Sequence, residues 1–231
     1  SLNNADGNIL EVGLGGRLDA TNVIEKNLAS IISTIGFDHQ DFLGNSLIKI
    51  ANEKAGIIKN KSNVILSKQK KIIRQIFKNK AEKNNCNFFC YDDDWKIKNK
   101  TFHYENIKID LQKLSLEGSH QFLNASCAIF SCLKLKKLNI ESSIIENSLK
   151  KIIYSGRLQK VNGEPFENYK NLNIWADCAH NILGFRVLRR WIVQNKIKKP
   201  TIIIALGIKK DYINILKEIK KIDPFFLGLI A

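Results

Sequence analysis

The sequence lacks any apolar run long enough to cross a membrane, and no secretory signal peptide is visible. Its five cysteines are an odd number, and none of them forms a C-x-x-C pair. Cys86 and Cys90 lie four residues apart, but no histidine or second cysteine pair completes a zinc-binding set. These absences exclude a disulfide scaffold and predict reduced thiols in a cytoplasmic protein that has no membrane partner.

Negative charge is in short supply: 37 lysines and arginines outnumber 22 aspartates and glutamates, which gives a net charge of +15. Such an excess makes a nucleic-acid partner a hypothesis. The lysines are spread along the chain, however, and no stretch alternates arginine with aromatic residues as a base-stacking surface does. We therefore expect no nucleic-acid partner, which salt-dependent retention on a polyanion, compared with specific duplex binding, would test.

A glycine-rich segment near the start is the most informative stretch, and residues 11–22 are E-V-G-L-G-G-R-L-D-A-T-N. The apolar residues 8–10 before it predict a buried strand that runs into a tight loop. Leu18 occupies the last glycine position of a dinucleotide fingerprint, and Arg17 stands where a triphosphate loop has lysine. Both of those sites are excluded, although an ordinary strand–helix connection would also explain the pattern.

Two acid or base side chains follow predicted strands in this part of the chain. Residues 28–35 predict a strand, and His39 comes just after it, as Glu11 follows residues 8–10. Parallel neighbours would bring both side chains into one crevice, where carboxylate and imidazole are ligands for divalent cations. A loop histidine bonded to an adjacent aspartate is the alternative for His39.

A predicted helix carries a lysine where its pattern calls for an apolar residue. The helix begins at Asn45 or Ser46 and ends near Ile58, and Lys54 falls within its apolar stripe. Burying an unpaired ammonium group is unfavourable, so such a lysine is paired, extends past the stripe to solvent, or is chemically altered. The pattern alone leaves these possibilities open.

The rest of the chain alternates strands and helices. From hydrophobic periodicity and capping residues we expect strands at 64–66, 88–91 and 201–207, helices at 70–83, 118–137, 140–153 and 181–195, and short antiparallel strands within 92–116. The run 201–207 is apolar throughout, which is typical of a parallel strand buried on both faces, and a helix and a terminal strand follow it. This order indicates an α/β fold that ends in a Rossmann-like domain.

The segment 11–22 resembles the signature of the dihydrofolate synthase/folylpolyglutamate synthase family, which belongs to the Mur-ligase superfamily of ATP-dependent amide-forming ligases. Further resemblances follow in the family's order along nearly the whole chain. They are 53–57 to E-K-A-G-I, 118–125 to G-x-H-Q-x-x-N-A, 156–157 to the end of P-G-R, and 177–182 to D-G-A-H-N-P. The chain departs from these motifs at Ser155, Cys178 and Ile182, which replace proline, glycine and proline.

The resemblance implies a fold, an activity and a set of site residues. The fold is a partial central ATPase-type domain with a mostly parallel sheet at 1–154 and a partial Rossmann-like domain at 155–231. The activity is ATP-dependent addition of L-glutamate to dihydropteroate, to a (tetrahydro)folyl-polyglutamate, or to both, through an acyl phosphate. The implied residues are Glu11, His39 and carbamylated Lys54 for Mg²⁺, Asn124, Arg157, Asp177 and His180 for ATP, and Leu18, Asp19 and Ala20 for the substrate.

One expected part has no counterpart in this sequence. The family's phosphate loop, G-T-N-G-K-[GS]-S, lies upstream of the glycine signature, and nothing here resembles it. We therefore expect a fragment of a monomeric enzyme, or a chain whose missing half another polypeptide supplies, with no ATP turnover on its own. The alternatives are another Mur-type amide ligase that acts on a cell-wall precursor, and a non-catalytic remnant or binding module.

Overall fold

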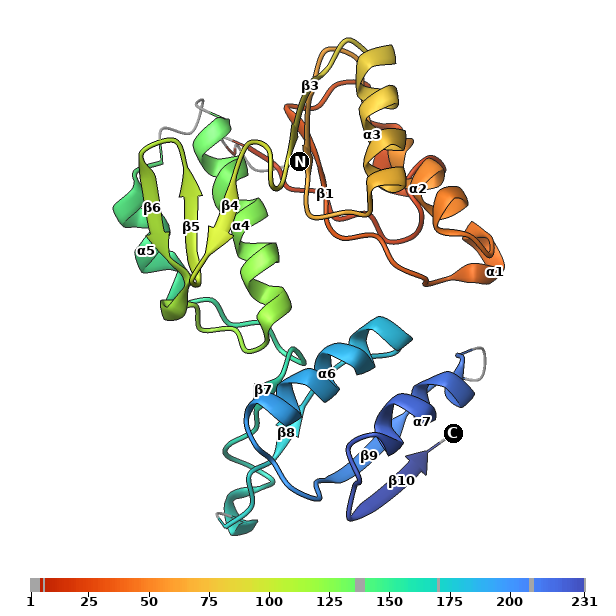
Figure 1. Cartoon of the computed structure of the whole chain (residues 1–231), viewed down its shortest axis with the longest axis vertical. Helices are drawn as coiled ribbons and strands as arrows, with labels where there is room; N and C mark the ends of the chain where they lie inside the picture. The colour runs from red at the N-terminus through yellow and green to blue at the C-terminus, as the bar shows by residue number, and fades with distance from the viewer. Residues whose placement is uncertain (1–4, 6, 136–139, 170, 208–209, 231) are drawn as a thin grey trace. The chain divides into compact units, whose positions relative to one another are not determined.

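The computed structural model describes residues 5, 7–135, 140–169, 171–207 and 210–230. The chain divides into two compact units. The first comprises Ser1–Lys113 with Phe122–Leu149, and the second comprises Leu114–Gln121 with Lys150–Ala231. The fold is α/β, as predicted, and each unit contains parallel strands covered by helices (Figure 1).

The first unit is built on a three-stranded parallel sheet in the order β1-β2-β3. Its elements are β1 (Ala29–Ile32), α1 (Gln40–Leu43), α2 (Leu47–Ala55), β2 (Asn63–Leu66), α3 (Lys71–Lys83) and β3 (Asn87–Cys90). The Ser46 hydroxyl accepts a hydrogen bond from the Lys49 N–H and so starts α2 where the sequence predicted. Ile73, Phe77 and Ala81 lie on one face of α3 and pack into the core of this sheet.

A second, antiparallel sheet completes the first unit, as the alternating residues of 92–116 predicted. It consists of β4 (Lys96–Lys98), β5 (Thr101–Tyr104) and β6 (Ile107–Asp110), next to η2 (Leu111–Lys113), α4 (Ser119–Lys134) and α5 (Ser142–Leu149). The rings of Trp95 and Phe130 stack with their centroids 4.1 Å apart, which fixes α4 against this region. The prediction that α4 reaches residue 137 lies outside the described residues.

The second unit contains a strand–helix–strand arrangement, as the sequence predicted (Figure 1). Its elements are β7 (Gln159–Lys160), η4 (Glu167–Tyr169), β8 (Trp175–Ala176), α6 (Ile182–Gln194), β9 (Thr201–Ala205), α7 (Tyr212–Lys220) and β10 (Phe226–Ile230). β9 and β10 pair in parallel, whereas β7 and β8 pair antiparallel. The core of this unit gathers Leu158, Phe185, Trp191, Ile204 and Ile215.

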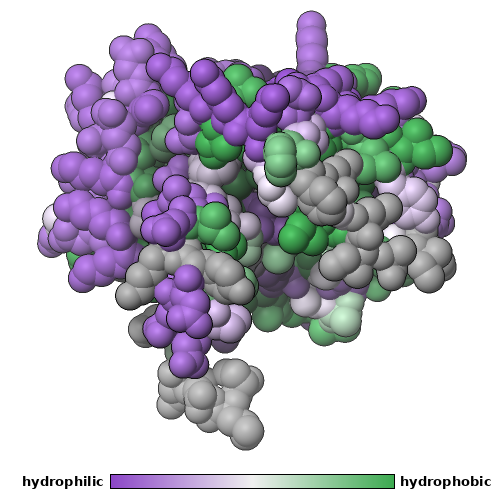
Figure 2. Space-filling model, turned by 90° about the horizontal axis from the view of Figure 1, so that it is seen from below, coloured by the Kyte–Doolittle hydropathy of each residue, from purple (hydrophilic) through white to green (hydrophobic). Residues whose placement is uncertain are grey.

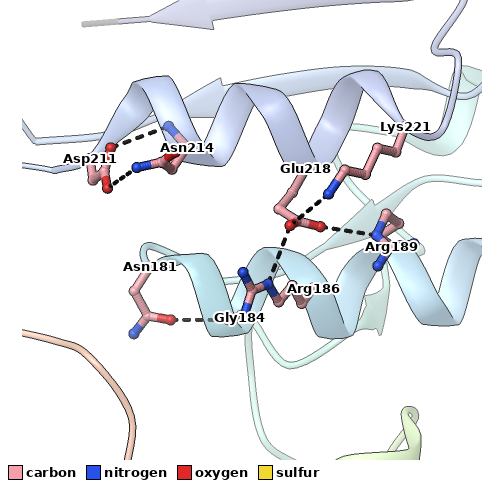
Figure 3. Close-up of polar contacts among 8 residues, drawn as sticks. All are labelled: Asn181, Gly184, Arg186, Arg189, Asp211, Asn214, Glu218 and Lys221. Atoms are coloured by element: carbon pink, nitrogen blue, oxygen red, sulfur yellow. Dashed lines mark hydrogen bonds and ion pairs between the residues drawn. The ribbon is translucent and has the colours of Figure 1, made fainter. Parts of the chain in front are cut away.

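One carboxylate joins α6 to α7 in the second unit (Figure 3). Glu218 on α7 is buried, and its oxygens accept hydrogen bonds from Arg186 at 3.2 Å, Arg189 at 3.1 Å and Lys221 at 2.9 Å. These bonds, the one from Lys221 first among them, lower the pKa of Glu218 from its ordinary value of 4.5. The cluster therefore fastens the two helices that cover the β9–β10 pair.

Two strand predictions were wrong, one in the existence of the strand and the other in its burial. Residues 8–10 form no strand, and Ile9 is 98% exposed, because no strand in the described part of the chain pairs with them. β9 is buried on one face only, and Ile203 on the other face is 69% exposed. Exposed apolar residues are common in this chain: on the face drawn in Figure 2, hydrophobic residues are interspersed among hydrophilic ones.

None of the helices that the structure describes is long and apolar enough to span a membrane. All five cysteines are free thiols, as predicted.

Candidate active site

The glycine loop of residues 13–19 packs directly on the C-terminal end of α2. The Arg17 N–H donates to the Glu53 carbonyl at 2.9 Å, and the Arg17 guanidinium pairs with the Glu53 carboxylate at 3.1 Å. A Cβ on Gly16 would lie 2.8 Å from that carbonyl, and one on Gly56 would overlap Arg17. Two stretches that are 36 residues apart are therefore held together so closely that both contact positions require glycine.

Asp19 shapes this loop from within. It is the N-cap of η1 (Ala20–Val23), and Oδ1 accepts from the Thr21 hydroxyl at 2.6 Å and the Thr21 N–H at 3.0 Å. Oδ2 accepts from the Leu14 N–H at 2.9 Å. These bonds, led by that of the Thr21 hydroxyl, lower the pKa of Asp19 from 3.8 to about 2. Next to it in sequence, Leu18 is 79% exposed, and Ala20 begins η1.

Lys54 lies on α2 beside this loop and is half-buried. Burial lowers the pKa of Lys54, while the carboxylates of Asp38 and Asp19, which are close enough to act on it, raise it. An amine with a lowered pKa is more often neutral and nucleophilic, which is the state that reacts with carbon dioxide. Asp38 is a neighbour that our sequence reasoning missed, although it directly precedes His39.

His39 and Glu11 occupy different surroundings. His39 is the N-cap of α1 with a left-handed φ of 48°, and its Nε2 lies 3.9 Å from an Asp38 carboxylate oxygen. Glu11 is exposed, and among the described residues no hydrogen bond or ion pair joins it to His39 or Lys54. In the described residues no group of three His, Cys, Asp or Glu side chains could hold a metal. The three-residue Mg²⁺ set stays a prediction.

In the second unit, Asp177 connects two segments that carry predicted nucleotide contacts. Its Oδ2 accepts from the Leu158 N–H and its Oδ1 from the Ala179 N–H, both at 2.8 Å. The Cys178 N–H donates to the Gly156 carbonyl at 2.8 Å. The turn 156–158 is thereby fastened to the segment that follows β8.

Arg157 belongs to the turn, and His180 to the segment after β8, that Asp177 joins. The Arg157 guanidinium lies over the Tyr154 ring, 5.4 Å from its centroid. His180 Nδ1 is 3.0 Å from the Cys178 carbonyl oxygen. Asn181 caps α6 by accepting from the Gly184 N–H at 2.9 Å, as predicted (Figure 3). A guanidinium and the positive end of a helix dipole are each groups that attract an anion.

Cys178 fills the space beside Gly156. The glycine has a φ of +71°, and a Cβ there would overlap the Cys178 sulfur. The cysteine that departs from the resembled motif thus contacts Gly156, in the turn that carries Arg157.

His120 is a second residue that the sequence reasoning missed. Its buried Nδ1 has no hydrogen-bond partner among the described residues, and its ring packs on Gly118, whose φ is +99°. Burial lowers the pKa of His120, Asp177 raises it and Arg157 lowers it, so all three lie near one another. The signal available in the sequence is its motif, in which the resemblance implies a role only for Asn124, an exposed residue of α4 in the first unit.

Comparisons with known proteins agree with the resemblance. No family model matches the chain. A dihydrofolate synthase/folylpolyglutamate synthase of Bacillus subtilis is 31% identical over 227 residues, which cover 93% of this chain and 51% of the relative. The enzyme of the same description from Buchnera aphidicola is 33% identical over 216 residues, with 88% and 47% covered.

Solved structures show the same fold. A structure described as an FPGS–AMPPCP–folate complex has a TM-score of 0.80 at 24% identity and covers 96% of this chain and 55% of that one. Folylpolyglutamate synthase of Mycobacterium tuberculosis complexed with ADP and AMPPCP has a TM-score of 0.77 at 20% identity, with 95% and 57% covered. The chain spans about half the length of the curated relatives it matches, and over most of its own length its sequence is similar to these dihydrofolate synthase/folylpolyglutamate synthases.

Proposed function

We propose that this chain supplies part of an ATP-dependent ligase that joins L-glutamate to dihydropteroate or to a folyl-polyglutamate. The observation that carries the proposal is the packing of the glycine loop on Glu53 and Lys54, because these two stretches resemble signatures of one family and are bonded to each other. Both curated relatives named above are described as dihydrofolate synthase/folylpolyglutamate synthases. The proposed domains are a partial central ATPase-type domain at 1–154 and a partial Rossmann-like domain at 155–231.

The metal site is proposed to form on the first unit. In the proposed carbamylation the Lys54 ammonium first loses one proton, and the neutral Nζ then bonds to the carbon of CO₂ and loses a second proton while one C=O π bond of CO₂ becomes a C–O⁻. A cation thereby becomes a carboxylate, and two protons are released to solvent. Because Asp38 and Asp19 already act on Lys54, the product would gather negative charge that a divalent cation neutralises. Glu11, His39 and the modified Lys54 would hold Mg²⁺, which when bound neutralises phosphate charge during transfer.

The chain's own residues would mainly bind and orient the reactants. Arg157 would pair with phosphate oxygens through its planar guanidinium, and the α6 N-terminus would favour the same negative charge. The proposed contacts are Asn124, Arg157, Asp177 and His180 for ATP, and Leu18, Asp19 and Ala20 for the pteridine substrate. The exposed side chain of Leu18 supports a substrate role, because an apolar residue in a fixed loop can pack on a flat ring.

A ligand panel tests the substrate assignment. The chain is titrated by calorimetry with dihydropteroate, tetrahydrofolate and a UDP-muramoyl compound, each with Mg²⁺ and a non-hydrolysable ATP analogue. We expect the pteridines to bind, and Leu18→Ala to weaken their binding, while the matched control Leu172→Ala at an exposed leucine of the second unit leaves it unchanged.

Two results would contradict that assignment. Binding of only the UDP-muramoyl compound would indicate another Mur-type ligase, and failure to bind any nucleotide or pteridine would indicate a non-catalytic module. We expect no glutamate-dependent ADP release from this chain alone, because it matches only about half of its relatives' length.

Lys54 modification is tested separately by ¹³C NMR in ¹³C-bicarbonate. We expect one carbamate resonance that Lys54→Gln removes and Lys59→Gln retains, since the Lys59 ammonium already donates to the Asn22 carbonyl at 3.0 Å. A spectrum without that resonance, or one in which it survives Lys54→Gln, contradicts the proposed metal site.

A further inference from the structure

The Arg157 guanidinium lies on an aromatic ring rather than on a carboxylate. Its central carbon is over the Tyr154 ring, 5.4 Å from the ring centroid, and no hydrogen bond or ion pair joins the guanidinium to another described residue. Two other arginines of the second unit, Arg186 and Arg189, both donate to the carboxylate of Glu218. Unlike them, Arg157 keeps its N–H donors for a partner from outside the described residues.

A tight turn carries Arg157, and its backbone is firmly attached. Gly156 has a φ of +71°, which suits a residue without a Cβ, and its carbonyl accepts from the Cys178 N–H at 2.8 Å. The Gly156 N–H donates to the side-chain oxygen of Gln159 at 3.0 Å. On the other side of Arg157, the Leu158 side chain is 2% exposed and belongs to the core. These attachments place the backbone of Arg157, but they do not place the end of its long, flexible side chain.

The ring face can place that end without occupying its donors. The negative face of an aromatic ring attracts a guanidinium, whereas the N–H groups of the guanidinium lie in its own plane and pair with phosphate oxygens at its edge. Tyr154 is 52% exposed and Arg157 is half-buried, so the pair borders solvent. A guanidinium that already rests on the ring loses less conformational entropy when it binds an anion.

We propose that Tyr154 is a positioning residue for Arg157: its ring holds the guanidinium so that the N–H donors meet the nucleotide phosphates. This inference rests on the proposed function, which assigns Arg157 to ATP, and it adds a residue to that site. The Tyr154 hydroxyl plays no part, since no hydrogen bond joins it to another described residue. Because the ring acts through Arg157, its contribution to affinity disappears when the guanidinium is removed.

A double-mutant cycle tests that dependence. ADP with Mg²⁺ is titrated by calorimetry into the unaltered chain, Tyr154→Leu, Arg157→Gln and the double variant. We expect ADP affinity to fall about two- to fivefold in Tyr154→Leu, which corresponds to the contribution of an exposed cation–π contact. We expect Tyr154→Leu to have little further effect when Arg157→Gln is already present.

Tyr154→Phe and Phe225→Leu are the matched controls. Phenylalanine keeps the ring and lacks only the hydroxyl, and Phe225 is an aromatic residue of the same unit that is 78% exposed. We expect both variants to leave ADP affinity unchanged. A loss in Tyr154→Phe as large as that in Tyr154→Leu would overturn the role of the ring face.

Other results of the cycle would also overturn the positioning role. A loss in Tyr154→Leu that persists beside Arg157→Gln would show that the ring contacts the nucleotide itself. Unchanged affinity would show that the ring contributes nothing, and a gain would show that it competes with the phosphates for the guanidinium. Absence of ADP binding by the unaltered chain would instead contradict the proposed nucleotide site, and with it any role of Tyr154 there.

Proton NMR of the Arg157 side chain provides the decision if Tyr154→Leu fails to fold. Protons that lie over the face of an aromatic ring are shifted upfield by its ring current. We expect this shift at the Arg157 side chain in the unaltered chain and in Tyr154→Phe. Shifts like those of a solvated arginine in both chains would overturn the positioning role.

Discussion

Two aspartates that the family resemblance assigns to ligands lie one in each unit, and they organise the chain differently. Asp19 accepts main-chain hydrogen bonds from residues five and two positions away, so it shapes its own loop. Asp177 accepts from residues 19 and two positions away, so it joins two segments. The glycine loop is instead attached to α2 by close backbone contact at Gly16 and Gly56. A carboxylate near a site can therefore be local or connecting, and only its partners distinguish the two.

The largest expected effects are on stability and come from adding a methyl group at each attachment point. Gly56→Ala and Gly156→Ala are each expected to reduce the free energy of unfolding by about 2–4 kcal/mol, because the new Cβ would overlap Arg17 or Cys178. The measurement is urea unfolding, with Gly163→Ala as the control. Gly163 has a φ of +91°, but a Cβ there would meet no atom within 4 Å. Gly163→Ala should therefore reduce the free energy of unfolding by only about 1 kcal/mol.

The same variants sharpen the contrast between the units. The atoms that a Cβ on Gly56 meets include the backbone of Arg17, whereas those met at Gly156 are led by the Cys178 sulfur. Adding Cys178→Gly should therefore recover part of the stability lost in Gly156→Ala, leaving about the 1 kcal/mol of backbone strain. No recovery in that double variant would contradict the contact that we describe.

A third carboxylate extends the comparison, because its donors are cationic side chains rather than main-chain N–H groups. Glu218→Gln is expected to lower the free energy of unfolding by about 1 kcal/mol, since its partners are partly exposed and screened. The folded-state pKa of Glu218 lies below 4.5, so its contribution is present above pH 4.5 and is lost as pH falls through the lowered value.

Urea unfolding at several pH values and salt concentrations checks this prediction. The unaltered chain should lose stability more steeply below pH 4.5 than Glu218→Gln does, and added salt should reduce the difference between them. A pH dependence that is identical in both chains would show that Glu218 is not held as its ionised form.

The smallest expected effect on stability comes from the protonation of Asp19 at low pH. Its pKa of about 2 in the folded chain lies below its ordinary 3.8, so its stabilising contribution is present above pH 3.8 and is lost as pH falls toward 2. A ¹³C NMR titration of the Asp19 carboxyl carbon should give the lowered value, and Thr21→Val should raise it by removing the leading hydrogen bond. A midpoint near 3.8 in the unaltered chain would contradict the local role of Asp19.

Local signals were sufficient to predict much of the fold. Ser46 and Asn181 cap the helices that they were expected to cap, because capping depends on a few neighbouring residues. The strand at 8–10 was predicted wrongly, since a strand depends on partners that its own residues do not specify. The exposed face of β9 was missed for the same reason, because burial is decided by what packs on the sheet.

The candidate site was predictable where a side chain conflicts with its local pattern. Lys54 interrupts an apolar stripe and so drew attention without any structure. Asp38 and His120 interrupt no pattern, and only their proximity to Lys54 or to Arg157 and Asp177 identifies them. The bond between Asp177 and Leu158 was equally invisible, because it joins residues that only folding brings together.

The central claim is that the second unit carries the nucleotide-binding part of the site, and amide chemical shifts test it most directly. Mg²⁺ and ADP are added to the isotope-labelled chain, and the shifted resonances are assigned to residues. The account predicts that the shifts concentrate at 156–158 and 178–184, and that Arg157→Gln reduces them at equal ADP concentration. No shifts at saturating ADP, or shifts confined to other segments, would contradict it.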